Sequence, residues 1–171
     1  WRARFGYLLI AFGVWDILYY AFLKVMTGWP NSLLDWDILF LIPLPWWGPW
    51  LAPVLIATLM ILFGTLASQY EKLAPTPWPG RWHGLAATVG IALALYVFMA
   101  DAIQVAGNGE QALRAMLPVN FQWPLFLVAL MLMAVPVGAM AAQVRAAHRS
   151  RITAGGGTIP VAARHIDPRL A

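Results

Sequence analysis

The sequence predicts an all-α integral membrane protein in which four transmembrane helices form one bundle. Of its 171 residues, 61% are hydrophobic and only 11% are charged. A soluble domain of this length cannot bury so much apolar surface, so the chain requires lipid as its solvent. Four stretches are long and apolar enough to cross a hydrocarbon layer of ~30 Å, namely residues 5–26, 51–70, 84–106 and 124–144.

The first span, residues 5–26, carries an aspartate at its centre. At helical spacing Gly6, Gly13, Asp16 and Tyr20 fall on one stripe of this helix. Because small residues allow another helix to approach closely, we expect Asp16 to point into protein and away from lipid. Gly28, followed by Trp29 and Pro30, is expected to end the helix.

Residues 31–48 connect the first two spans, and we expect a short interfacial or re-entrant helix there. Asn31 or Ser32 offers an N-cap, and Asp35 would lie near the positive end of such a helix. Three prolines between positions 43 and 49 would end it before the second span. Five tryptophans surround the segment, as in an aromatic belt at headgroup depth: Trp29, Trp36, Trp46, Trp47 and Trp50.

Each span also carries a row of small residues at which membrane helices approach closely. Beyond Gly6 and Gly13, these rows are Ala57, Gly64 and Ser68; Ala86, Gly90 and Ala94; and Ala134, Gly138 and Ala142. Four helices can satisfy one row each within a single bundle. The loop after the third span is expected to hold a short helical piece at about residues 110–116, and Pro136 is expected to kink the fourth span.

Basic residues predict that both termini lie in the cytoplasm and that the membrane is of the bacterial inner-membrane type. Placing the termini and the turn near Lys72 on one side puts nine Lys and Arg residues there, against Lys24 and Arg114 on the other side. Cytoplasmic segments carry such an excess. The net charge of +4 is thereby explained by segment ends, and no nucleic-acid partner is expected.

The chain divides into a transmembrane bundle, residues 1–145, and a basic, glycine-containing cytoplasmic tail, residues 146–171. Ordering such a tail costs backbone entropy that three consecutive glycines recover poorly. We therefore expect it to lie on a partner protein, with Arg145, Arg149 and Arg151 near the membrane and residues 159–166 making the apolar contact. An anionic lipid surface is the alternative.

Polar chemistry is concentrated in three aspartates. The tetrapeptide WDIL occurs at residues 15–18 and again at 36–39, which gives Asp16 and Asp37 similar neighbours, and Asp101 lies in the third span. Ionisable groups inside membranes are costly, so these are the candidate site residues, with Tyr20 one turn beyond Asp16 and Gln104 one turn beyond Asp101.

The aspartates allow four interpretations: hydrogen-bonded structural residues, a proton or cation site, acid–base groups acting on a lipid, or oxygen ligands of a divalent metal. No metal site and no cofactor of its own is predicted, since cysteine is absent and no histidine lies at depth. Bound lipids are expected.

Two functions from different classes follow. The first is a non-catalytic integral subunit of a larger membrane complex of the respiratory or another energy-converting kind. On this interpretation the chain has no catalytic activity of its own. The second is a small transporter or lipid-acting membrane enzyme with a carboxylate pocket in the outer half of the membrane. The second requires Asp16, Asp37 and Asp101 to converge on one cavity, whereas the first leaves them apart or facing partner chains.

Overall fold

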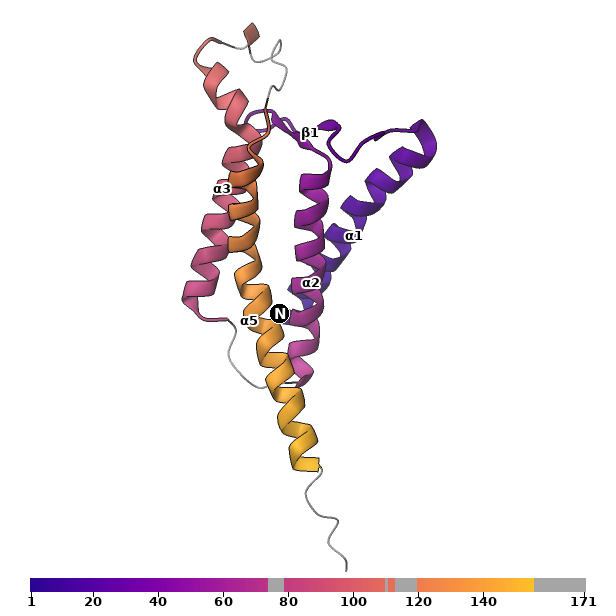
Figure 1. Ribbon diagram of the computed structural model, residues 1–171, viewed down its shortest axis with the longest axis vertical. Helices are drawn as coiled ribbons and strands as arrows, with labels where there is room; N and C mark the ends of the chain where they lie inside the picture. Colours follow the sequence, from indigo (N-terminus) through magenta and orange to yellow (C-terminus); the bar gives the residue numbers. More distant parts are fainter. Residues whose placement is uncertain (74–78, 110, 113–119, 156–171) are drawn as a thin grey trace, which may run out of the picture.

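A computed structural model describes residues 1–73, 79–109, 111–112 and 120–155. This part of the chain contains four long helices and one small β-hairpin (Figure 1). All four helices are long and apolar enough to cross a membrane, which confirms the predicted candidate spans. The elements are α1 (Arg2–Thr27), β1 (Trp36–Phe40), β2 (Trp46–Pro49), α2 (Leu51–Leu73), α3 (Arg81–Ala106) and α5 (Trp123–Gly155).

Helix α1 ends where the sequence predicts. Gly28 adopts the left-handed conformation, with φ of 78°, and its N–H donates to the carbonyl oxygen of Lys24 at 3.1 Å. The Lys24 ammonium group then donates to the carbonyl oxygens of Gly28 at 2.7 Å and Pro30 at 2.8 Å. A cation at the C-terminal end of a helix also complements the helix dipole, so Lys24 caps α1.

The predicted interfacial or re-entrant helix in residues 31–48 is wrong. These residues form an antiparallel hairpin, in which Trp36 pairs with Pro49, Asp37 with Gly48 and Ile38 with Trp47. A helix this short is marginal, and prolines that lack an N–H cannot continue it. Pairing two extended segments instead satisfies backbone groups across the hairpin, which explains why the strands prevail.

Helices support the hairpin, because two strands alone are marginally stable. Gly48 of β2 lies so close to α3 that a Cβ atom added there would come within 2.8 Å of the Phe98 ring. Trp36 and Leu39 of β1 pack against the group of buried residues that contains Phe98. The hairpin therefore closes one end of the helical bundle (Figure 1).

Asp35 shapes the turn that leads into the hairpin, and does not cap a helix as expected. Its Oδ2 accepts the backbone N–H of Asn31 at 2.6 Å and of Ser32 at 3.1 Å. Trp50 ties the other end of the hairpin to this turn, because its indole Nε1–H donates to the carbonyl oxygen of Ser32 at 2.7 Å. The sequence thus identified the polar residues of this segment, but they stabilise a turn and not the end of a helix.

Glycines bring α1 and α2 into close contact along an antiparallel seam, which we call the glycine seam. An added Cβ on Gly6 would lie 2.7 Å from the carbonyl oxygen of Gly64, and one on Gly13 would lie 2.7 Å from that of Ala57. One heptad further along, the rings of Tyr20 and Trp50 lie 5.5 Å apart. Backbones can approach this closely only where side chains are minimal.

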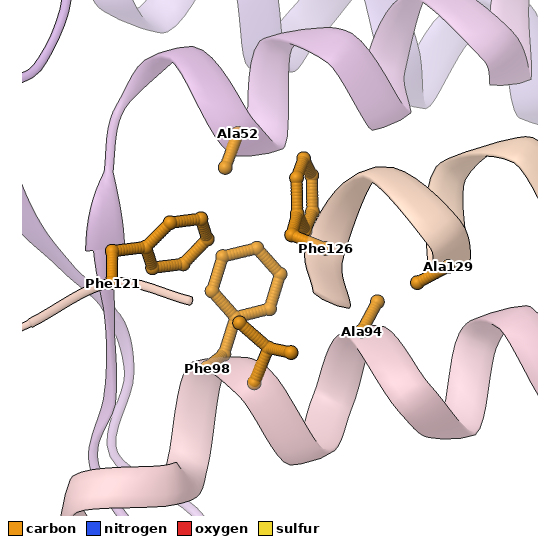
Figure 2. Packing of buried hydrophobic residues seen from close by; sticks show 7 residues of the cluster. Ala52, Ala94, Phe98, Phe121, Phe126 and Ala129 are labelled. Carbon is orange, nitrogen blue, oxygen red and sulfur yellow. The ribbon is translucent and has the colours of Figure 1, made fainter. Parts of the chain in front are cut away.

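On its other side α2 packs on α5, and α5 in turn packs on α3, around the main core. Seven buried residues form this core (Figure 2): Ala52, Ala94, Val97, Phe98, Phe121, Phe126 and Ala129. Phe98 and Phe126 lie 5.7 Å apart in an edge-to-face arrangement, which aromatic rings favour. Gly90 allows α3 to approach α5, since an added Cβ there would lie 2.7 Å from the carbonyl oxygen of Ala129.

Helix α5 is longer than the predicted fourth span. It continues past Pro136 and through the first ten residues of the expected tail, ending at Gly155. The predicted contact at residues 159–166, the helical piece near 110–116 and Arg114 fall largely or wholly outside the described residues. Helix α5 ends at the end of the bundle away from the hairpin, where α1 begins (Figure 1).

Candidate functional site

A cavity of about 600 Å³ lies between α1 and α3, beneath the hairpin. Helix α1 packs on α2 and makes no contact with α3 or α5 in the described part of the chain. Trp15 and Tyr19 on α1 and Ile91 on α3 line the cavity and are about half exposed, at 59%, 47% and 48%. The cavity is therefore a groove that opens between α1 and α3, and we call it the acidic groove.

Asp37 occupies the hairpin end of the acidic groove. Its Oδ2 accepts the hydroxyl proton of Tyr20 at 2.9 Å, and its Oδ1 accepts the backbone N–H of Ile38 at 2.9 Å. Tyr20 is only 4% exposed, and this hydrogen bond satisfies a polar atom that would otherwise be costly to bury. The bond also ties α1 to the hairpin, seventeen residues further along the chain.

Asp16 lines the same groove one helical turn before Tyr20. It is half-buried. No described residue donates a hydrogen bond to its carboxylate. The two WDIL repeats therefore bring their aspartates to one place, one from a helix and one from a strand.

The glycine seam sets the depth of Asp16. Gly6 faces Gly64, Gly13 faces Ala57 and Tyr20 faces Trp50, so Asp16 lies level with Val54. That is one turn inside the start of α2, or about 5 Å at the rise of an α-helix. Although Asp16 is near the middle of α1, it lies close to the hairpin end of α2, because α1 extends past the point where α2 begins.

Aromatic side chains form the α1 wall of the acidic groove. The rings of Phe12 and Trp15 are 5.6 Å apart, and those of Trp15 and Tyr19 are 6.3 Å apart. Trp46 of β2 also lines the groove, and its indole nitrogen is buried with no acceptor among the described residues. The polar atoms are thus concentrated at the hairpin end.

The remaining wall of the groove is apolar and mostly aliphatic. Helices α2, α3 and α5 contribute Ile56, Met60, Ile91, Leu95 and Met133, among others. Lys, Arg and His are absent from the lining that the structure describes. The acidic groove thus combines two carboxylates and two phenols at one end with an uncharged apolar surface along the rest, which suits a ligand with two chemically different ends.

The other predicted site residues lie elsewhere. Asp101 and Gln104, on α3, line neither the acidic groove nor the second cavity, which lies around Lys24. Asp101 does make an interaction with its surroundings. Arg145 and Arg149 are exposed on α5, at the end away from the hairpin. The side chain of Arg151 lies outside the described residues, and the predicted contact of these arginines with a partner or lipid stays a prediction.

The hydrogen bond between Tyr20 and Asp37 was not predicted, because Tyr20 was expected to be a partner of Asp16 on the same helix. One signal in the sequence could have indicated it. Gly6, Gly13 and Tyr20 recur at intervals of seven, and so do Trp50, Ala57 and Gly64. Aligning these two series antiparallel brings Tyr20 to the start of α2 and hence beside the hairpin.

No group of three His, Cys, Asp or Glu side chains that could hold a metal ion occurs among the described residues. By length and composition, its four apolar helices make the chain a multi-pass membrane protein. Comparison with family models, with curated proteins and with solved structures gives no match. The groove itself is therefore the basis for proposing a function.

Proposed function

We propose that the protein binds an amphiphilic molecule of the membrane in the acidic groove, as a small transporter or lipid-acting enzyme. Asp16 and Asp37 line one cavity with an apolar remainder, and this shared lining carries the proposal. Asp101, which the predicted three-aspartate pocket also required, does not line it. The polar end of the ligand lies beside the carboxylates and its apolar chain lies along α2 and α3. A volume of about 600 Å³ falls within the usual range for small-molecule sites.

The proposed orientation has both termini in the cytoplasm of a bacterial-type inner membrane. Helix α1 begins and α5 ends at the same end of the bundle (Figure 1). Most Lys and Arg residues of the sequence belong to the two terminal segments and to the turn after the second span. The hairpin then lies at the outer surface. In this orientation the acidic groove lies in the outer half of the bilayer, where a ligand meets the carboxylates near the headgroups.

Binding can be tested by narrowing the groove at its rim. Ile91→Trp adds a bulky ring on the α3 side, at a residue that is 48% exposed and outside the core. Ile103→Trp is the matched control, since Ile103 is on the same helix, is 44% exposed and does not line the groove. The full chain would be purified in mild detergent, and retained lipids would be measured by native mass spectrometry.

We expect the natural chain and Ile103→Trp to retain one lipid-class molecule per chain, and Ile91→Trp to lose it. Equal retention by all three chains would contradict the proposal. In the natural chain background, Asp16→Asn then separates binding from chemistry. If lipid is retained while transport or turnover stops, protonation of Asp16 is part of the activity.

A subunit of a larger membrane complex is the second candidate, and the outer face of α5 favours it. The small-residue rows on α1, α2 and α3 are used inside the bundle, whereas a Cβ added to Gly138 would meet no atom within 4 Å. Ala142, one turn further, is also exposed. This face of α5 is available to another helix, either from a partner or from a second copy.

Gly138→Leu tests the second candidate, because it blocks close approach without disturbing the bundle. We expect unchanged thermal stability of the isolated chain and loss of any larger assembly on size-exclusion chromatography. Deleting residues 153–171 tests the tail in the same assay. Monodisperse behaviour of the natural chain at its own mass of 18.9 kDa, with and without the tail, would exclude a stable complex.

A further inference from the structure

The charge and the aromatic wall of the acidic groove restrict the chemical class of the ligand that it can bind. We infer that the ligand is a cationic amphiphile, an organic ammonium group on an apolar chain, with the ammonium group between Asp16 and Asp37. This inference rests on the proposed function, since it names the class of molecule that the groove binds. Charge complementarity carries it.

Both carboxylate oxygens of Asp37 are held at the hairpin end of the groove by hydrogen bonds. One of its oxygens accepts from the Tyr20 hydroxyl and the other from the Ile38 N–H, each at 2.9 Å. Asp16 lines the same groove. Two ionised carboxylates in a partly apolar cavity repel each other, so a ligand with a positive charge would stabilise both at once.

The described lining supplies no counter-charge of its own. Lys24 is the closest lysine along α1, but its ammonium group donates to the carbonyl oxygens of Gly28 and Pro30. It also lines the second cavity and not the acidic groove. A phosphate or sulfate group in the groove would meet two carboxylates and no described cation, so an anionic headgroup is disfavoured.

The aromatic wall suits an ammonium group, and the apolar walls require that the ligand have a chain. Trp15, Tyr19 and Tyr20, all on α1, line the groove together with Asp16 of α1 and Asp37 of β1. Indole and phenol faces attract ammonium groups, and this attraction strengthens where water is excluded. An inorganic cation would leave most of the volume of about 600 Å³ unfilled. The alkyl chain of an amphiphile would fill this volume and contact Ile56, Met60 and Ile91.

The test compares three probes that share a dodecyl chain and carry a cationic, a neutral or an anionic head. Dodecyltrimethylammonium is the cation, the same chain with a tert-butyl group in place of the trimethylammonium is its neutral isostere, and dodecyl sulfate is the anion. Binding to the full chain in maltoside micelles would be measured by isothermal titration. We expect the cation to bind at least about tenfold more tightly than the neutral isostere, since each 1.4 kcal/mol of charge attraction is a factor of ten.

Asparagine substitutions then locate the charge effect. Asp16→Asn combined with Asp37→Asn should abolish the preference for the cation, while binding of the neutral isostere stays the same. Asp35→Asn is the matched control, because Asp35 lies in the neighbouring turn and does not line the groove. It should leave the preference intact. The comparison of probes on the natural chain needs no variant, so it holds even if the double variant fails to fold.

The outcomes separate the inference from the proposed function. Equal binding of the cation and the neutral isostere, or tighter binding of dodecyl sulfate, would overturn the inference and leave an amphiphile site in place. Absence of saturable binding by all three probes would overturn both. A preference for the cation that persists in the double variant would also overturn the inference, because the charge effect would then lie outside the acidic groove.

Discussion

Helix α2 is packed by glycines on the side that faces α1, and by aromatic rings on the side that faces α3 and α5. On the first side Gly6, Gly13 and Gly64 bring two backbones together along a narrow line. On the second, Phe98 and Phe126 fill the space between three helices. The difference teaches how a small bundle keeps a groove open. A narrow seam holds α1 firmly without supplying the bulky side chains that would fill the space toward α3.

The aromatic side should be the more sensitive to loss of volume. Phe126 is fully buried, at 0% exposure, so Phe126→Ala should lower the free energy of unfolding by about 2 to 3 kcal/mol. We take the lower part of the usual range, because lipid replaces water as solvent and mainly the cavity term applies. Thermal unfolding in detergent measures the effect. The control is Phe22→Ala, at a residue 62% exposed on α1, which should unfold like the natural chain.

The glycine seam should be the more sensitive to gain of volume. Gly64→Ala puts a methyl group against the backbone of α1 at Gly6 and Ile10, where nothing can move without separating the helices. We expect a loss of about 1 to 3 kcal/mol. Gly138→Ala places the same methyl group in open space and should leave stability unchanged. If the two variants unfold alike, helix propensity and not the seam determines the result, and the contrast between the two sides of α2 fails.

A single hydrogen bond fastens the seam to the hairpin. Tyr20→Phe removes the donor to Asp37 Oδ2 while keeping the buried ring, so we expect a loss of about 1 kcal/mol. Tyr7→Phe on the same helix, at a residue that is 59% exposed, is the control. A double-variant cycle with Asp37→Asn would show whether the two side chains act together. Additive effects would mean that the bond contributes nothing to stability.

The smallest expected effect concerns the turn before the hairpin. Backbone N–H groups of Asn31 and Ser32 donate to the Asp35 carboxylate and hold its pKa below the ordinary value of 3.8. A lowered pKa in the folded state contributes stability above pH 3.8, and this contribution is lost as the pH falls through the folded-state pKa. The unfolding temperatures of the natural chain and Asp35→Asn should therefore converge below pH 3.8. A constant difference across that range would contradict this role.

Local patterns in the sequence predicted the parts of the fold that local chemistry determines. The four apolar stretches match the four helices, and Gly28 ends α1 as its conformational freedom allows. The hairpin could not be predicted in this way. Its strands are stabilised by each other and by Phe98 and Phe121, which are distant in sequence, whereas the capping residues and prolines near it are compatible with several local structures.

The candidate site could likewise be predicted only where local patterns determine it. Asp16 and Tyr20 share a helical stripe, so their placement near α2 follows from helical periodicity. The approach of Asp37 depends on the hairpin and on the offset between α1 and α2, and neither is written in a local pattern. Asp101 shows the converse. Its position one and a half turns from the end of a span resembles that of a groove residue, yet α3 carries it outside the groove.

Helix α1 touches α2 alone among the described helices, and in a bilayer this determines how a ligand reaches the groove. In the proposed orientation the opening between α1 and α3 faces acyl chains, so the proposed ligand would enter sideways from the membrane by two-dimensional diffusion. Occupancy then follows the mole fraction of the molecule among the lipids and not its concentration in water. Apparent affinities measured at different ratios of lipid to protein should consequently differ, although the contacts in the groove remain the same.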